Sequence, residues 1–113
     1  MRLHFHQSLA SGRWQQLSFV EQMANIGSEV ERTIKWRKKS QLKFFYRAFD
    51  RADELIDLTI DCHSHDGPKL KELLRTKECL IDDFIFDNSY GSTNESWQKY
   101  FLAFTYATQA NRR

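Results

Sequence analysis

The loop residues Cys62, His63, His65 and Asp66 form the densest group of metal-ligand side chains in the sequence. Zinc takes about four nitrogen or sulfur ligands at roughly 2.0–2.3 Å. The other cysteine, Cys79, falls inside a predicted helix, about 16 Å along its axis, because a helix rises about 1.5 Å per residue. Cys62 and His63 are adjacent and lack the usual spacing between ligands. The sequence therefore predicts a polar loop, with neither a metal centre nor a cofactor nor a catalytic cysteine–histidine pair.

A second group of polar side chains follows helical spacing on the flank of the first predicted helix. It consists of Asn25, Glu29, Arg32 and Trp36. An amide, a carboxylate, a guanidinium and an indole on one strip have two interpretations. They form either a surface for a ligand or partner, or a hydrogen-bond network that fixes the register of the helix. We favour the structural interpretation and keep the binding surface as the functional alternative.

A third group is basic, because residues 32–47 contain no Asp or Glu and interleave cations with aromatic side chains. The cations of this basic pole are Lys35, Arg37, Lys38, Lys39, Lys43 and Arg47. A positive pole beside aromatic rings suits the phosphate backbone of a nucleic acid. Asp82, Asp83 and Asp87, at the end of the third predicted helix, are expected to fold back to the pole and neutralise part of it.

Acidic residues on two predicted helices, Glu54 and Asp57 followed by Glu78 and Asp82, provide an alternative function. Their pattern resembles the acidic helices with which all-α nucleoside triphosphate pyrophosphohydrolases hold magnesium. This resemblance implies a metal-dependent nucleotide hydrolase. The sequence departs from the E-x-x-D motif of that family, because Glu78 and Asp82 are one residue farther apart. The extra residue turns the second acid about 100° around the helix, and we prefer a non-enzymatic protein.

Periodic apolar residues predict four helices that must position these groups. Their expected ranges are 19–39, 41–61, 68–86 and 94–110. Ser18 with Glu21, and Ser92 with Glu95, match the capping box that begins a helix, and Ser40 is the expected cap of the second helix. Four helices of similar length with short connections predict an all-α protein, an antiparallel up-down four-helix bundle.

Small residues in the first predicted helix, Ala24, Gly27 and Ser28, leave little side-chain bulk at its middle. Another helix is therefore expected to approach closely there.

Length and composition indicate one domain, residues 1–113, with a loose N-terminal arm at residues 1–17. No apolar run approaches the ~18 residues of a membrane span, and no signal-peptide pattern is present. We expect a cytoplasmic protein with free cysteines and no membrane contact.

Charge is unevenly distributed along the chain. Residues 1–48 hold nine Lys and Arg against three Asp and Glu, and residues 49–113 hold eight Lys and Arg against twelve Asp and Glu.

Two predicted helices, 41–61 and 94–110, have apolar residues around more than half of their circumference. The first of them is then either central in the bundle or part of a subunit interface. Because a single bundle does not cover so much apolar surface, we expect a homodimer through these two helices. The expected function is a non-enzymatic module that binds a protein or nucleic-acid partner.

Four segments resemble a small bacterial family of all-helical proteins with no assigned activity. They are MANIGSEV at 23–30, RADELIDLT at 51–59, LKELLR at 70–75 and DNSYGS at 87–92. The resemblance spans about residues 14–106 and implies a fold, which does not carry a function. The expected architecture is also similar to ribosomal-RNA intervening-sequence proteins and to the HEPN domains of toxin–antitoxin pairs. The arginine–histidine spacing of the HEPN ribonuclease motif does not occur in this sequence.

Overall fold

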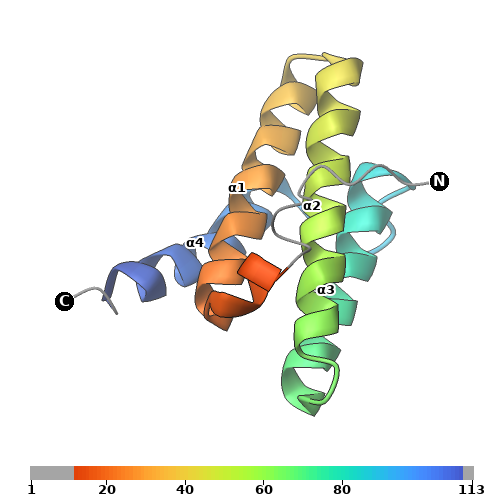
Figure 1. Ribbon diagram of the computed structural model, residues 1–113. Coiled ribbons are helices and arrows are strands. Elements are labelled where there is room, and N and C mark those ends of the chain that lie inside the picture. Colours follow the sequence, from red (N-terminus) through yellow and green to blue (C-terminus); the bar gives the residue numbers. More distant parts are fainter. Residues whose placement is uncertain (1–11, 111–113) are drawn as a thin grey trace.

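In the computed structural model, which describes residues 12–110, every regular element is a helix (Figure 1). The elements are a short 3-10 helix η2 (Trp14–Gln16) and the α-helices α1 (Phe19–Lys38), α2 (Leu42–Cys62), α3 (Gly67–Phe84) and α4 (Asn94–Ala110). The four predicted helices are confirmed, and their ends differ from the prediction by two residues at most.

Ser18 and Glu21 begin α1 as the sequence predicts. The Glu21 N–H donates to Ser18 Oγ over 3.2 Å, and the Ser18 N–H donates to Glu21 Oε1 over 3.0 Å. The predicted Ser40 cap of α2 is wrong. Ser40 takes a left-handed conformation, with φ 54°, while the Gln41 N–H donates to Trp36 O over 3.0 Å. Many helices terminate in this way, so Ser40 ends α1 and α2 begins without a side-chain cap.

The cap of α4 lies one residue later than the sequence predicts. The Ser96 N–H donates to Thr93 Oγ1 over 3.0 Å, and the Thr93 N–H donates to Ser96 Oγ over 2.9 Å. Thr93 and Ser96 thus form the reciprocal capping hydrogen bonds that the sequence predicts for Ser92 and Glu95. The Ser92 N–H donates instead to Asn88 Oδ1 over 2.9 Å, because the preceding loop closes on that side chain.

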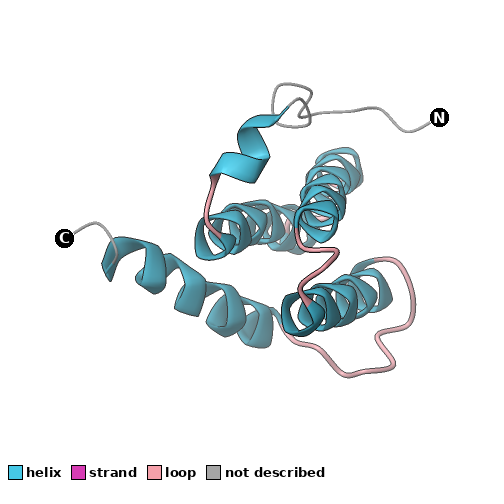
Figure 2. Ribbon diagram, turned by 60° about the horizontal axis from the view of Figure 1, so that its bottom comes forward, coloured by secondary structure: helices cyan, strands magenta, loops and turns pink. Residues whose placement is uncertain are grey.

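The four helices form a bundle in which α1, α2 and α3 run alternately up and down side by side, and α4 returns downward at a wide angle across α1 (Figures 1 and 2). α1 packs along α2 and α4, and α2 packs along α3 and η2, whereas α3 and α4 approach each other far less closely. The bundle is therefore closed along three edges and open along the α3–α4 edge. The C-terminal part of α4 extends beyond the other helices (Figure 2). Within residues 12–110, no helix combines the length and apolar character of a membrane span.

The core is formed by buried side chains of all four α-helices and of η2. Trp14 is 1 % exposed, and its Nε1 donates to Thr59 Oγ1 over 2.9 Å. Burial of this indole orders residues 14–16, which differ here from the predicted loose arm, and residues 1–11 of that prediction lie outside the described residues. Because α1, α3 and η2 cover α2, its wide apolar arc is explained in large part by a central position in the bundle.

The small residues of α1 are the point where α4 crosses it. A Cβ built on Gly27 would lie 2.7 Å from Phe101 Cβ, which is closer than side-chain carbons pack. Ala24 and Ser28 line, together with Gly27, a hollow between α1 and α4. The predicted close approach is thus confirmed, and the helix that makes it is α4.

Gly27→Ala is expected to destabilise the protein by about 1–3 kcal/mol, because Phe101 or the whole of α4 must move. This cost exceeds the gain of at most ~1 kcal/mol from the higher helix propensity of alanine. Gly67→Ala is the matched control, since nothing lies within 4 Å of a Cβ at that position. Urea unfolding measures both variants, and a Gly27→Ala protein as stable as the control would contradict the close contact.

Candidate functional site

The loop that follows α2 contacts α1 through His63. Across the described part of the chain, no three His, Cys, Asp or Glu side chains come together in a way that could hold a metal ion. His63 Nε2 lies 2.8 Å from Gln22 Oε1, and its ring packs edge-on against Phe19. Gln22 Nε2 in turn donates to Trp14 O over 3.0 Å. Burial, and then the charge of Lys69, lowers the pKa of His63, which favours the neutral imidazole in this buried chain of hydrogen bonds.

The acids of α2 in the hydrolase alternative are engaged within the bundle. Lys77 of α3 pairs with Asp57 and lies 3.5 Å from Asp53. Glu54 is only 3 % exposed. These carboxylates therefore neutralise a lysine or lie buried, and they do not line an open site.

The acids of α3 face a different part of the molecule. Glu78 Oε1 accepts from the Tyr90 hydroxyl over 2.6 Å. Asp82 accepts the backbone N–H groups of Ser89 and Tyr90 over 2.9 and 3.1 Å. Both residues fold the α3–α4 loop. The structure thus does not bring Glu54, Asp57, Glu78 and Asp82 together, which is the convergence that the hydrolase alternative requires.

The polar strip of α1 makes contacts along its own helix. Arg32 donates to Glu29 Oε1 over 2.8 Å, and Asn25 Nδ2 donates to Glu21 O over 2.8 Å. Glu29 is 8 % exposed, and within residues 12–110 its Oε2 has no hydrogen-bond partner. Both bonds stay inside α1, while Trp36 packs elsewhere. The four side chains of the strip therefore do not act as one group.

Arg37 differs from the other cations of the basic pole, because its half-buried side chain has partners on α3 and α4. Its guanidinium donates to Asp83 Oδ1 over 3.0 Å and to Asn94 Oδ1 over 2.7 Å, and lies 4.3 Å from the centre of the Phe84 ring. Asp83 Oδ2 also accepts from Trp97 Nε1 over 2.8 Å. We call these five residues the Arg37 cluster. Because the Asp83 side chain is 4 % exposed, the cluster joins α1, α3 and α4 around a buried carboxylate.

The remaining cations of the pole lie exposed around the turn between α1 and α2. They are Lys35, Lys38, Lys39, Lys43 and Arg47. None of the five forms an ion pair with an acidic side chain of the described chain. The predicted neutralisation is limited to Asp83, which pairs with Arg37, while Asp82 binds the loop backbone. The exposed part of the pole therefore keeps its positive charge.

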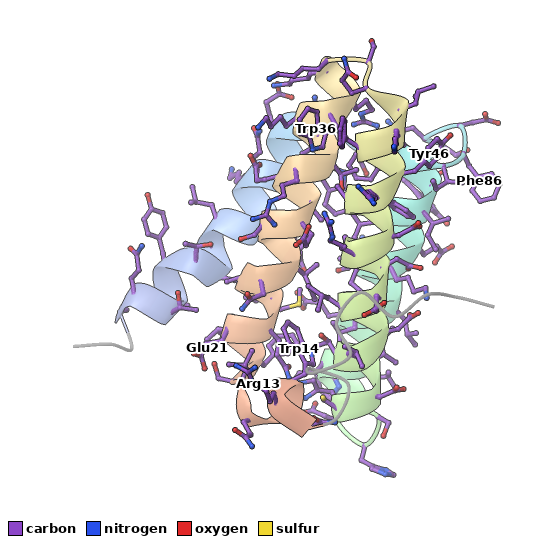
Figure 3. The ribbon with its side chains drawn as sticks, turned by 45° about the horizontal axis from the view of Figure 1, so that its top comes forward. Arg13, Trp14, Glu21, Trp36, Tyr46 and Phe86 are labelled. Atoms are coloured by element: carbon purple, nitrogen blue, oxygen red, sulfur yellow. The ribbon has the colours of Figure 1, made fainter. Side chains whose placement is uncertain are left out.

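An aromatic pair lies among these cations. The rings of Trp36 and Phe44 are 4.8 Å apart, and the ammonium groups of Lys35 and Lys39 lie 4.9 and 5.6 Å from the Trp36 ring centre. Phe44 is 42 % exposed, and Figure 3 shows Trp36 near the end of α1, far from Trp14. We call this surface the basic tip. It consists of Lys35, Trp36, Lys38, Lys39, Lys43, Phe44 and Arg47.

A groove that the sequence does not indicate follows the open α3–α4 edge. Its volume is about 500 Å³. Its lining includes Lys71, Glu72, Arg75, Thr76, Cys79, Trp97 and Tyr100. The spacing of Lys71 and Arg75 by one helical turn is visible in the sequence. That α3 and α4 stand apart is visible only in the packing.

Comparison with known proteins leaves the function to the geometry. No family model matches this chain, no curated protein matches it, and no solved structure matches it. The resemblance to a small bacterial family stays a prediction. Function is therefore argued from the described side chains.

Arg37→Gln is expected to destabilise the protein by about 2 kcal/mol, because it leaves the buried Asp83 carboxylate without its cation. Lys38→Gln removes the same charge from the neighbouring exposed position and should change stability by at most about 0.5 kcal/mol. Chemical unfolding at neutral pH measures both variants. Equal stability of the two would show that the Arg37 cluster does not hold the helices together.

Proposed function

We propose that this protein is a non-enzymatic interaction module that binds single-stranded nucleic acid through the basic tip. The observation that carries the proposal is the exposure of five cations without described acidic partners around the Trp36–Phe44 pair. Lysine and arginine attract the phosphate backbone and release its counterions. Exposed aromatic rings add stacking with unpaired bases, which any base sequence can provide.

The distribution of charge supports a local contact at this end of the molecule. The cations come from the last turns of α1 and the first turns of α2, so they surround the aromatic pair on two helices. The net charge of the whole chain is only +2, and farther along α2 the carboxylates of Asp50 and Asp61 are exposed. A polyanion would thus be attracted by the tip and repelled by the surface farther along α2.

The residues of the basic tip favour a nucleic-acid ligand over the hydrolase and protein-partner alternatives. The hydrolase alternative needs carboxylates that converge. Asp57 on α2 pairs with Lys77, whereas Glu78 and Asp82 on α3 accept hydrogen bonds from the α3–α4 loop. A protein partner remains an outcome of the binding test, since an acidic protein would meet the same cations. A cytoplasmic location belongs to this proposal, because it places the tip where nucleic acid is present.

The test measures how binding of a labelled single-stranded RNA depends on salt. Fluorescence anisotropy should show binding that weakens steeply between low and physiological salt. The variant Lys38→Gln/Lys39→Gln/Lys43→Gln should weaken binding at least tenfold. It should also reduce the slope of log K against log salt by about 2, since each lost phosphate contact lowers that slope by ~0.7.

A variant with the same change in net charge, Lys69→Gln/Lys71→Gln/Lys99→Gln, is the matched control and should bind RNA like the original protein. Phe44→Ala should weaken the binding of single-stranded RNA more than the binding of a duplex, because only unpaired bases stack on the ring. Absence of RNA binding at low salt, or equal losses in the two triple variants, would reject the basic tip as the site.

We also propose that two copies of the chain associate through α4. Within this helix only Trp97 and Phe101 are buried in the bundle. Leu102 and Tyr106, one turn apart on another face, are 48 % and 63 % exposed. A hollow of about 320 Å³ beside Leu102 could receive side chains of a second copy. The exposed apolar residues of α2, Leu42, Phe44 and Tyr46, lie in its first turns, so α2 contributes less to this proposal than the sequence suggests.

Sedimentation equilibrium at micromolar concentration should give twice the chain mass of 13.5 kDa. Leu102→Glu/Tyr106→Glu should give the single-chain mass, because two carboxylates cannot be buried there without partners. Ser64→Glu, an exposed change outside α4, controls for the added charge and should remain dimeric. A single-chain mass for the unmodified protein would reject the dimer and leave the proposal for the basic tip unaffected.

A further inference from the structure

The groove along the α3–α4 edge is spanned by polar contacts that tie its walls together. The Tyr100 hydroxyl donates to Glu72 Oε1 over 2.7 Å and lies 3.1 Å from Thr76 Oγ1. Trp97 Nε1 donates to Asp83 Oδ2 over 2.8 Å. These bonds connect α4 to α3 while the two helices remain too far apart to fill the space between them. The resulting cavity of about 500 Å³ is within the ~300–1,000 Å³ typical of small-molecule sites.

The wall of the groove is aromatic on the α4 side. Trp97 is 7 % exposed, and its ring meets the Tyr100 ring at an interplanar angle of 81°, with 6.5 Å between centroids. Cys79 and Thr76 extend this surface on the α3 side. Burial, supported by the carboxylate of Glu72, raises the pKa of Tyr100, so the phenol stays neutral. A flat aromatic ring would contact this wall over the largest area.

The rim of the groove is positive. Lys71 and Arg75 lie one helical turn apart on α3, and neither makes an ion pair with an acid among residues 12–110. Glu72, the one acid in the described lining, already accepts the Tyr100 hydroxyl. The lining therefore has two cations against one carboxylate, which already accepts a hydrogen bond from Tyr100. The planar fork of a guanidinium can bind both oxygens of an incoming carboxylate.

We infer that the groove binds a small aromatic carboxylate, with its ring against Trp97 and Tyr100 and its carboxylate at Arg75 and Lys71. A neutral arene would leave the two cations without a partner, and a small inorganic anion would leave the aromatic wall uncovered. The inference does not depend on the basic tip, because the cations of the tip belong to α1 and α2. The two binding activities can therefore be tested separately in the full chain.

The probe is 2-naphthoate, and 2-naphthalenemethanol is the neutral analogue of the same size. NMR follows the indole N–H signals of the three tryptophans during the titration. We expect a saturable shift of the Trp97 signal, while Trp14 and Trp36 serve as internal controls outside the groove. The neutral analogue should bind at least about tenfold more weakly, because it lacks the charge-assisted hydrogen bonds.

Arg75→Gln should weaken naphthoate binding about tenfold. Lys99→Gln, an exposed change on α4 outside the lining, should bind as the original protein does. Both side chains are exposed, so neither change should unfold the bundle. No Trp97 response at millimolar naphthoate would overturn the inference, as would equal affinity for the neutral analogue or equal affinity in the two variants. A response of Trp36 in place of Trp97 would also overturn it, since the probe would then occupy the basic tip.

Discussion

The ion pair between Arg37 and the buried carboxylate of Asp83 is the constraint on which the arrangement of the helices depends. One carboxylate of α3, 4 % exposed, receives the guanidinium of α1 and the indole N–H of Trp97 from α4. A buried carboxylate without donors is costly, so each of these helices is held where its donor reaches Asp83. Three helices thus meet at one polar point, although α3 and α4 hardly pack against each other.

The open edge of the bundle follows from the way α4 is attached. Its first turn is fixed by the Arg37 cluster through Asn94 and Trp97, and its middle is fixed by Phe101 over Gly27. The contacts of Asn94 with Arg37 and of Phe101 with Gly27 draw α4 toward α1, while Trp97 ties its first turn to Asp83 of α3. On the α3 side, Tyr100 reaches across with a hydroxyl, which bridges the gap without closing it. The groove is therefore a consequence of where the packing is tight and where it is only hydrogen-bonded.

The same ion pair divides a run of similar residues into two roles. Arg37 is drawn inward by Asp83, whereas Lys38 and Lys39 at the neighbouring positions remain in water with no acid brought to them by the fold. The sequence alone treats all three as cations of one helix end. Because Asp83 is 46 residues away in the chain, only the folded arrangement distinguishes the structural cation from those that can meet a partner.

Local chemistry in the sequence determined the four helices, the capping box of Ser18 and Glu21, and the lack of side-chain bulk around Gly27, because each depends on residues within one or two turns. It did not determine that Ser40 ends a helix, since a serine that caps and a serine that terminates have the same local sequence. The tertiary structure alone decided the separation of the carboxylates, the pairing of Arg37 with the buried Asp83 and the groove beside Tyr100. Each of these depends on distances between helices, which arise from packing and not from any single stretch of the chain.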